Sequence, residues 1–212
     1  MPTIDKDDYD LTDPSVAFKA IPCYYIVGGD GGQRFHLNTF THELTTTTSL
    51  DRELKDNYTL VVQATNDCFR VPPNITKFDP KDNSLLQVLI GVRDVNDNAP
   101  KMTQKVFTGG FTTDIDFGTV FMEIKAVDND VGANSVLNYY IISEVRQTLT
   151  EGLDTISAEP FVINRITGEI SLNFDPQNNM KGYFQFDVLA NDTDGLADSA
   201  KVYVMLFSFN YR

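Results

Sequence analysis

The chain has 212 residues, 42% of them apolar, and carries 30 acidic against 17 basic side chains, for a formal net charge of −13. This acidity disfavours nucleic acid and anionic membrane surfaces as partners, because both would repel the protein. The length predicts two domains. No apolar run approaches the roughly 18 residues of a membrane span, so we expect no direct membrane insertion in this fragment. Met1-Pro2-Thr3 opens directly onto charged residues, so we expect any targeting segment to lie elsewhere.

Short segments in which β-branched and aromatic residues alternate with polar ones predict strands along the whole chain. Glycine- and aspartate-rich turns separate them, and the many short strands favour an all-β sandwich architecture. Residues 148–157 are expected to form a short helix or a loop. The clearest strand candidates are 23–27, 58–64, 85–93, 119–126, 137–142, 183–190 and 200–207.

The two halves of the chain repeat the same pattern in the same order. Tyr24-Tyr25-Ile26-Val27 corresponds to Tyr139-Tyr140-Ile141-Ile142, and Phe35-His36-Leu37 corresponds to Phe161-Val162-Ile163. Asp5-Lys6-Asp7 corresponds to Asp128-Asn129-Asp130 but lies almost at the first residue. We therefore expect the first copy to lack its two opening strands.

A stretch near the middle of the chain concentrates oxygen-bearing side chains. It reads Asp94-Val95-Asn96-Asp97-Asn98-Ala99-Pro100, with two carboxylates and two carboxamides in five consecutive residues. Such a stretch cannot form a core strand, because its charges would be buried unpaired. A hard cation bound through oxygen would neutralise it, and outside the cell this cation is calcium. The stretch therefore predicts a calcium-binding linker between two β-domains.

Four motifs in this order resemble the calcium motifs of cadherin extracellular repeats: Leu50-Asp51-Arg52-Glu53, Asp94–Pro100, Asp128-Asn129-Asp130 and Ala190-Asn191-Asp192. Taken singly, each also fits a turn or a solvated surface. An EF-hand is a poor alternative, because the glycine and the terminal glutamate that it requires do not follow Asp128 and Asp130 at their positions. The motifs are most similar to those of the tip-link cadherins, and Fat-type cadherins and other protocadherins are alternatives.

The resemblance implies two tandem Greek-key β-sandwich repeats of the immunoglobulin-like, cadherin type, at residues 1–98 and 99–212. It also implies two to three calcium ions at the central linker. Asp51 and Glu53 would hold the two upper ions, shared by Asp94, the Val95 carbonyl and Asp97. Asp130 would bridge the middle and third ions. The remaining ligands of the third ion would be Asn96, the Asn98 carbonyl, Asp128, Asp192 and a carbonyl near Asn134. Arg52 would pair with a local charge.

Departures from the family pattern weaken the far ends. Thr113 stands near the position of a glutamate that cadherin repeats usually carry, and Asp175-Pro176-Gln177 replaces the Asp-Arg-Glu motif. We therefore expect little or no calcium at the lower end of the second repeat, unless Asp114 or Asp116 supplies a ligand. Thr65-Asn66 similarly weakens the upper end of the first repeat.

Covalent features are consistent with an extracellular ectodomain of a single-pass membrane protein. The implied sandwich places Cys23 and Cys68 on neighbouring strands, where they would form a disulfide closing a loop of about 45 residues, worth roughly 4 kcal/mol. Three sequons predict N-glycosylation at Asn57, Asn74 and Asn191.

Calcium-dependent cell–cell adhesion or mechanical linkage is the expected function. The expected partners are neighbouring cadherin repeats of the same chain and another cadherin ectodomain. One alternative is a homophilic adhesion module that dimerises through its sandwich faces. A second is a secreted β-sandwich enzyme with a structural calcium. We expect no enzyme, because His36 and His42 lack a nearby nucleophile in the sequence pattern and the paired acids are better explained as ligands.

Overall fold

The computed structural model describes residues 22–29, 33–150, 156 and 159–208. Asp5-Lys6-Asp7, which we expect to correspond to Asp128-Asn129-Asp130, lies outside these residues. Among the described residues, secondary structure is almost entirely β-strand, joined by turns and one short 3-10 helix. Contacts divide the chain into two compact units, Met1–Arg93 and Asp94–Arg212, each described by itself below. The expected boundary between the two repeats, after residue 98, stays a prediction.

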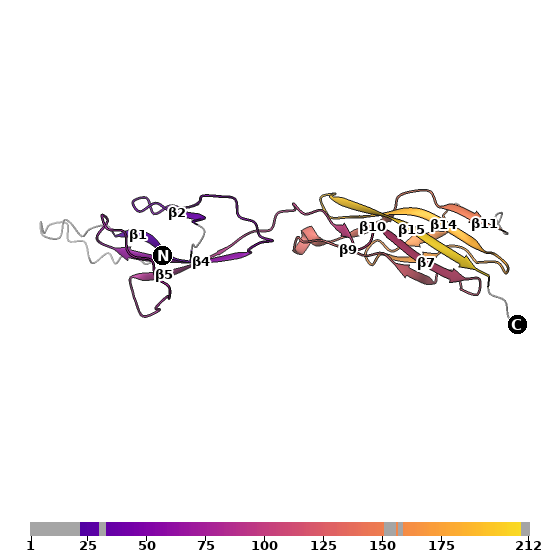
Figure 1. Cartoon of the computed structure of the whole chain (residues 1–212), viewed down its shortest axis with the longest axis horizontal. Helices are drawn as coiled ribbons and strands as arrows, with labels where there is room; N and C mark the ends of the chain where they lie inside the picture. Colours follow the sequence, from indigo (N-terminus) through magenta and orange to yellow (C-terminus); the bar gives the residue numbers. More distant parts are fainter. Residues whose placement is uncertain (1–21, 30–32, 151–155, 157–158, 209–212) are drawn as a thin grey trace, which may run out of the picture. The chain divides into compact units, whose positions relative to one another are not determined.

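Unit 1 contains five strands in the residues that the structure describes (Figure 1). One sheet has the order β1-β4-β5 and is antiparallel throughout. A two-stranded antiparallel sheet, β2-β3, accompanies it. The bounds are β1 Cys23–Gly28, β2 Phe35–Leu37, β3 Leu44–Thr46, β4 Asn57–Thr65 and β5 Leu85–Gly91.

Unit 2 contains the fuller set of strands. One sheet has the order β10-β14-β15-β7, and β11 extends it by pairing with β14. A second sheet has the order β12-β13-β8, and β6 pairs with β9. The strands are β6 Lys101–Met102, β7 Val106–Thr112, β8 Val120–Glu123, β9 Ala126–Val127, β10 Asn138–Ile141, β11 Arg146–Leu149, β12 Phe161–Ile163, β13 Glu169–Leu172, β14 Gly182–Asn191 and β15 Ala197–Phe207; the 3-10 helix η2 spans Gly132–Ser135.

Alternate residues of β14 and β15 form the centre of the unit 2 core. Phe184, Phe186 and Val188 on β14 are buried, as are Val202 and Val204 on β15, because successive side chains of a strand point to opposite faces. The same large core cluster includes Phe107 and Phe111 of β7 and Phe161 of β12. Both sheets therefore supply side chains to one core, as in a β-sandwich.

The register of the strands confirms the internal repeat. In unit 1, Phe35 and Tyr58 meet edge to face with ring centroids 5.2 Å apart, and in unit 2 Phe161 and Phe184 do so at 5.0 Å. The strand pairs β4–β5 and β14–β15 are both antiparallel, with Val62 opposite Leu86 and Val188 opposite Ala200. Strands β1, β2, β3, β4 and β5 thus correspond to β10, β12, β13, β14 and β15.

Two expectations for the strands need correction. Thr148 and Leu149, expected in a helix or loop, belong to β11, which pairs with β14 through Leu149 opposite Gly182. The strand expected over residues 119–126 is interrupted after Glu123 and resumes as β9 at Ala126, where it pairs with β6. The other predicted strands are present with boundaries shifted by at most three residues.

Candidate metal centre

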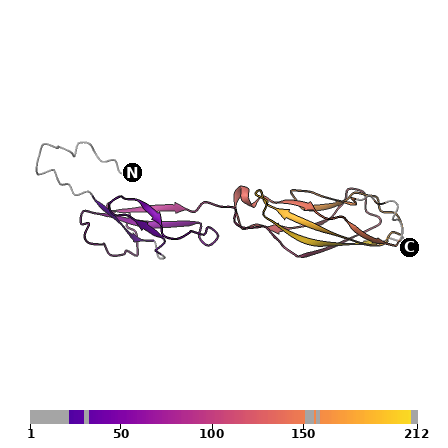
Figure 2. The same ribbon diagram turned by 90° about the horizontal axis from the view of Figure 1, so that it is seen from above.

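Three segments of unit 2 converge where β14 ends and β15 begins: residues 94–98, residues 128–134 and the β14–β15 turn. The 3-10 helix η2 lies at this end of the unit (Figure 2). Asn134 of η2 donates from Nδ2 to Asp94 Oδ2 at 2.9 Å, and the Val131 amide donates to the same oxygen at 3.2 Å. Thr193 of the turn donates from Oγ1 to the Ala133 carbonyl at 3.3 Å. These bonds join residues that lie up to 60 positions apart in the sequence.

Asp130 is the buried carboxylate of the middle segment, with only 4% of its surface exposed. Asn98 donates to it twice, from Nδ2 to Oδ1 at 2.8 Å and from the backbone amide to Oδ2 at 3.2 Å. The Asp130 amide in turn donates to Asp128 Oδ1 at 2.9 Å. Carboxylate oxygens of Asp94 and Asp130 lie within 4.8 Å of one another. Two negative charges at this separation repel strongly unless a cation lies close to them.

Asp192 is the most buried acid of the centre, with 2% of its surface exposed. Its Oδ1 accepts the backbone amides of Asp194, Gly195 and Leu196 at 3.0, 2.7 and 2.9 Å, and so fixes the turn between β14 and β15. Its Oδ2 is buried and accepts no hydrogen bond. One oxygen of this carboxylate therefore builds the turn, and the other remains available for a ligand.

The same division holds for Asp128, whose Oδ1 caps the Asp130 amide while its buried Oδ2 has no hydrogen-bond partner. The carboxamide of Asn96 is also buried with neither its nitrogen nor its oxygen hydrogen-bonded. Leaving buried polar oxygens unsatisfied costs about 1–3 kcal/mol each, more when they are charged. Carboxylate and carboxamide oxygens are the donors that Ca²⁺ prefers. The residues present therefore fit a hard cation.

The remaining predicted ligands of unit 2 are placed as follows. Asp97 is exposed and accepts a hydrogen bond from Asn98 Nδ2 at 2.9 Å. The Val95 carbonyl accepts the Asp97 amide at 2.8 Å. Asn134 donates a hydrogen bond from its side-chain amide to Asp94, and its backbone carbonyl makes no hydrogen bond described above. Coordination by Asp97, Val95, Asn98 and Asn134 stays a prediction.

Asp51 and Glu53 belong to unit 1 and lie in a turn before β4. Asp51 Oδ1 accepts the Leu54 amide at 2.9 Å, and Glu53 forms an ion pair with Arg52. This ion pair confirms the local charge pairing predicted for Arg52. The part of Asp51 and Glu53 in calcium binding stays a prediction.

One polar group of the centre was missed as such from the sequence. Asn191, predicted as a glycosylation site and as part of a calcium motif but not as a ligand, has a buried Oδ1 without a hydrogen-bond partner and immediately precedes Asp192. Its place at the end of β14, beside a buried aspartate, could have drawn attention to it. Asn57 and Asn74 are exposed, as glycosylation sites must be. Glycosylation of all three stays a prediction.

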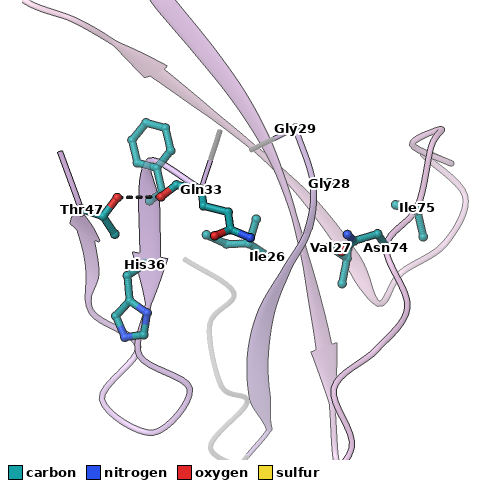
Figure 3. Close-up of a pocket in the computed structure, with 10 residues that line it drawn as sticks. Ile26, Val27, Gly28, Gly29, Gln33, His36, Thr47, Asn74 and Ile75 are labelled. Carbon is teal, nitrogen blue, oxygen red and sulfur yellow. Dashed lines mark hydrogen bonds between the residues drawn. The ribbon is translucent and has the colours of Figure 1, made fainter. Parts of the chain in front are cut away.

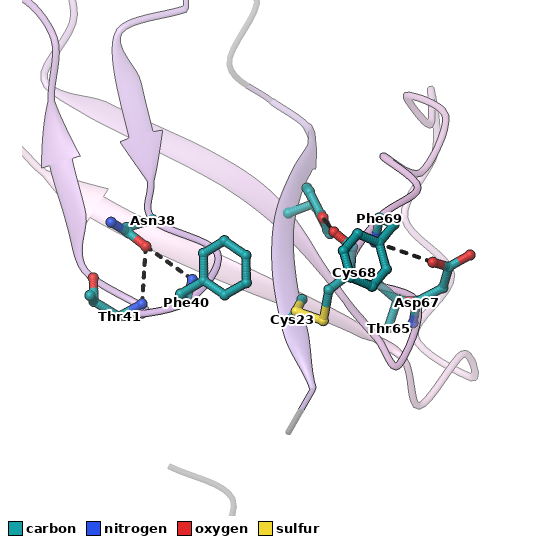
Figure 4. Close-up of a disulfide and its surroundings, with 9 residues drawn as sticks. Cys23, Asn38, Phe40, Thr41, Thr65, Asp67, Cys68 and Phe69 are labelled. Atoms are coloured by element: carbon teal, nitrogen blue, oxygen red, sulfur yellow. Dashed lines mark hydrogen bonds between the residues drawn. A yellow bond between two sulfur atoms is a disulfide. The ribbon is translucent and has the colours of Figure 1, made fainter. Parts of the chain in front are cut away.

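Cys23 and Cys68 form the predicted disulfide, with Cα atoms 5.5 Å apart (Figure 4). Cys23 begins β1 and is 3% exposed, and Cys68 lies in the long connection between β4 and β5. Tyr25 supports the same connection by donating its hydroxyl to the Cys68 carbonyl at 2.7 Å. The disulfide therefore fastens this connection to the sheet of unit 1.

A cavity of unit 1 shows no arrangement suited to catalysis among its described residues (Figure 3). His36 borders it, but the described lining contains no carboxylate and no cysteine or serine. Thr47, the hydroxyl residue of the lining, donates to the Gln33 carbonyl at 2.6 Å. His42 lies elsewhere, edge to face against Tyr24 with centroids 4.7 Å apart. Both histidines thus have packing or surface positions.

Comparisons with known proteins agree with this class of repeat. The Cadherin domain family matches residues 6–89. Chicken Protocadherin-15 is 32% identical over 187 residues, which are 88% of this chain and 9% of that protein. Human Protocadherin gamma-A6 is 31% identical over 168 residues, covering 79% and 16%. Mouse Cadherin-23 is 26% identical over 206 residues, covering 91% and 6%.

Solved structures show the same fold. The crystal structure of mouse Cadherin-23 EC22-24 matches with a TM-score of 0.63 at 25% identity, covering 89% of this chain and 53% of that one. The human Desmocollin-1 ectodomain matches with a TM-score of 0.67 at 20% identity, covering 92% and 35%.

These findings define tandem β-sandwich repeats of the cadherin type, and the chain belongs to the cadherin family. The cadherin relatives are adhesion proteins and not enzymes, so the alternative of a secreted enzyme is set aside. The chain spans only 6–16% of the curated relatives named above. No helix among the described residues is long and apolar enough to cross a membrane.

Proposed function

We propose that the chain is a calcium-dependent adhesion or mechanical-linkage segment of a cadherin ectodomain, and that calcium binds at the unit 2 end described above. The observation that carries the proposal is the set of buried, unpartnered oxygens on Asp128, Asp192 and Asn96, in segments that also hold Asp94 and Asp130. The proposed complement is two to three ions. Asp51 and Glu53 of unit 1 would complete the ligands, so that calcium would restrict motion between the repeats and let them transmit force.

The physical reason for calcium dependence is repulsion among the acids. Without a cation, the charges of Asp94, Asp130 and their neighbours destabilise the segments that carry them. A bound ion removes this repulsion, and any ligand that binds only the folded state raises its stability, by about 2.7 kcal/mol at a concentration of one hundred times Kd. Calcium is therefore expected to order the three segments and raise the melting temperature.

Asp128→Asn tests the proposal, because it keeps an oxygen that can cap the Asp130 amide while weakening the free oxygen as a ligand. Calorimetric titration of the chelator-treated chain with calcium should show at least a tenfold weaker affinity for the variant. In chelator, the variant should melt at the same or a higher temperature than the parent chain, because one repelling charge is gone.

Glu144→Gln is the matched control, since Glu144 is an exposed acid in the segment between β10 and β11. It should leave calcium affinity unchanged. Absence of calcium binding to the parent chain, or equal affinity in both variants, would overturn the calcium centre.

A second candidate function, homophilic adhesion through a sandwich face, is favoured by the outer face of the larger unit 2 sheet. Tyr183 on β14 and Met205 and Phe207 on β15 are 42%, 45% and 52% exposed, and Tyr183 lies opposite Met205. Exposed apolar patches of this kind often mark protein interfaces. Sedimentation at each point of the calcium titration separates the two functions. A monomer throughout supports linkage, and a calcium-dependent dimer supports adhesion through this face.

A further inference from the structure

The turn between β14 and β15 contains a chemically reactive pair of residues, Asp194-Gly195. An aspartate followed by glycine can convert to isoaspartate without an enzyme, because glycine has no side chain to hinder the reaction and its backbone is permissive. Both residues are exposed, and the Asp194 carboxylate accepts no hydrogen bond within the described part of the chain. Nothing lies within 4 Å of a Cβ added at Gly195, so the space around the pair is open.

The conversion uses only groups of this turn and water. The Gly195 nitrogen attacks Cγ of Asp194 and closes a succinimide ring, while the amide hydrogen, one carboxylate oxygen and a proton from solvent leave as water. Water then opens the ring at either carbonyl, which gives aspartate or isoaspartate without a change of mass. No oxidant, reductant or other reactant is required.

The buried carboxylate of Asp192 holds the attacking group in place. The Gly195 amide donates to Asp192 Oδ1 at 2.7 Å, the shortest of the three bonds that this oxygen accepts. Hydrogen bonds to an ionised acceptor are stronger than those between neutral groups, and water competes little for an acceptor that is 2% exposed. Because the nitrogen loses its hydrogen and its planar geometry on attack, this bond has to break first.

Conversion would loosen the turn. Isoaspartate inserts one extra main-chain carbon between residues 194 and 195, which displaces the Gly195 and Leu196 amides from Asp192 Oδ1. The Asp192 amide donates to the Leu196 carbonyl at 3.0 Å, and this bond closes the same turn. Asp192 would therefore lose the partners that fix its side chain in the candidate metal centre.

We propose that Asp194 is a site of spontaneous isoaspartate formation that Asp192 holds in check, and that conversion weakens the candidate metal centre. The first part needs no metal ion. The second part rests on the proposed calcium binding. One hydrogen-bond acceptor thus sets how fast the turn changes chemically.

The test of the first part follows isoaspartate in the full chain during incubation in chelator at neutral pH. Enzymatic methylation of isoaspartate, followed by peptide mass spectrometry, distinguishes conversion at residue 194 from conversion elsewhere. The folded parent chain should convert about tenfold or more slowly than the same chain in guanidinium chloride, and Asp192→Ala should remove most of this difference. Asp192→Asn keeps an acceptor oxygen but no charge, so its rate should lie between those of the parent and Asp192→Ala.

Asp187→Asn is the matched control, because Asp187 is an acid earlier on β14 whose carboxylate pairs with Lys201 at 3.1 Å. It should convert like the parent chain, and circular dichroism should show the variants folded. Conversion of the folded parent as fast as in guanidinium chloride would overturn the proposal, as would equal acceleration by Asp192→Ala and Asp187→Asn. Where Asp192→Ala does not fold, Asp192→Asn decides, and a rate equal to that of the parent would overturn the proposal.

The second part is tested on parent chain that has been converted in denaturant, refolded and separated from the unconverted form. Calorimetric titration should show about tenfold or more weaker calcium affinity for the converted chain, because the position of Asp192 is no longer fixed. Equal affinity would overturn the effect on the metal centre. Absence of calcium binding to the unconverted chain would overturn the proposed function and this second part, whereas the conversion rates would still decide the first.

Discussion

Asp198 shows how one side chain holds the beginning of unit 2 against its last strand. It accepts Lys105 Nζ at 2.6 Å on both oxygens and the Met102 amide at 2.9 Å. The Lys105 ammonium, followed by the Met102 amide, lowers the pKa of this carboxyl below its usual value of 3.8. Because the side chain is 21% exposed, water screens the pair and its contribution is modest.

We expect Asp198→Asn to destabilise unit 2 by about 1 kcal/mol at neutral pH, the upper range for an exposed ion pair. A carboxyl with a lowered folded-state pKa contributes stability that is present above the unfolded pKa and lost as the pH falls through the folded pKa. The difference in unfolding free energy between parent and variant should therefore be constant above about pH 5 and disappear toward about pH 2.

Urea unfolding in chelator at a series of pH values measures the effect of Asp198→Asn. Asp116→Asn, in the exposed turn before Thr119, serves as the control for removal of one acid. A difference for Asp198→Asn that grows as the pH falls would contradict the assignment.

At the scale of elements, the turn between β12 and β13 depends on one glycine. Gly168 has a φ of 75°, its amide donates to the Asn164 carbonyl, and its carbonyl accepts the Ile124 amide at 2.9 Å. A Cβ added here would lie 2.3 Å from the Ile124 carbonyl oxygen. The turn thus brings β8 and β13 closer than any side chain at residue 168 would permit.

Gly168→Ala should therefore cost more than the left-handed backbone alone, for a total of roughly 2–4 kcal/mol. Gly118→Ala separates the two effects, because Gly118 has a φ of 77° but nothing within 4 Å of an added Cβ. It should cost about 1 kcal/mol. Thermal unfolding of both variants measures the difference, and equal losses would show that the close approach to Ile124 is relieved at little cost.

Strands with a clear period of two were predictable, and strands held mainly by distant partners were not, for a physical reason. Buried and exposed residues alternate along β14 and β15, so their sequences show a clear period of two. Strand β7 carries Gly109 and Gly110, which have low strand propensity, and it is held in place by parallel pairing with β15, a contact between distant segments. β11 was misread because its partner Gly182–Gln185 lies more than thirty residues away.

In the candidate site too, features set by the local sequence were predictable, and features set by the folded backbone were not. The acidic motifs were recognisable because several oxygen ligands must lie close together along the chain. The unpartnered oxygens of Asp128 and Asp192 could not be predicted, since which oxygen caps a turn and which stays free depends on the folded backbone.

At the scale of the whole molecule, the described parts of the two units differ in how much core they have. The described core cluster of unit 1 centres on Phe35, Tyr58 and Leu60, whereas that of unit 2 joins side chains from both sheets. Less buried apolar area means less stabilisation, at about 25 cal/mol per Å². The disulfide of unit 1 offsets part of this deficit by restricting its unfolded state.

We expect two thermal transitions in calorimetry, with unit 1 unfolding first. Reductant should shift only the first transition downward, because the disulfide lies in unit 1 and contributes roughly 4 kcal/mol in the chain-entropy model. Calcium should shift the second transition upward, and the first as well if Asp51 and Glu53 of unit 1 complete the ligands as proposed. A single transition, or an effect of reductant on the second, would contradict this independence of the units.

The disulfide also limits how far the protein can lengthen under load. Cys23 and Cys68 are separated by 45 residues along the chain, which include most of the strands of unit 1. Fully extended, such a segment would span about 150 Å. While the bond is intact, a pull on the two ends of the chain passes through the sulfurs and leaves this length in reserve. Under load, unit 1 would therefore lengthen less in oxidising surroundings than after reduction of the disulfide.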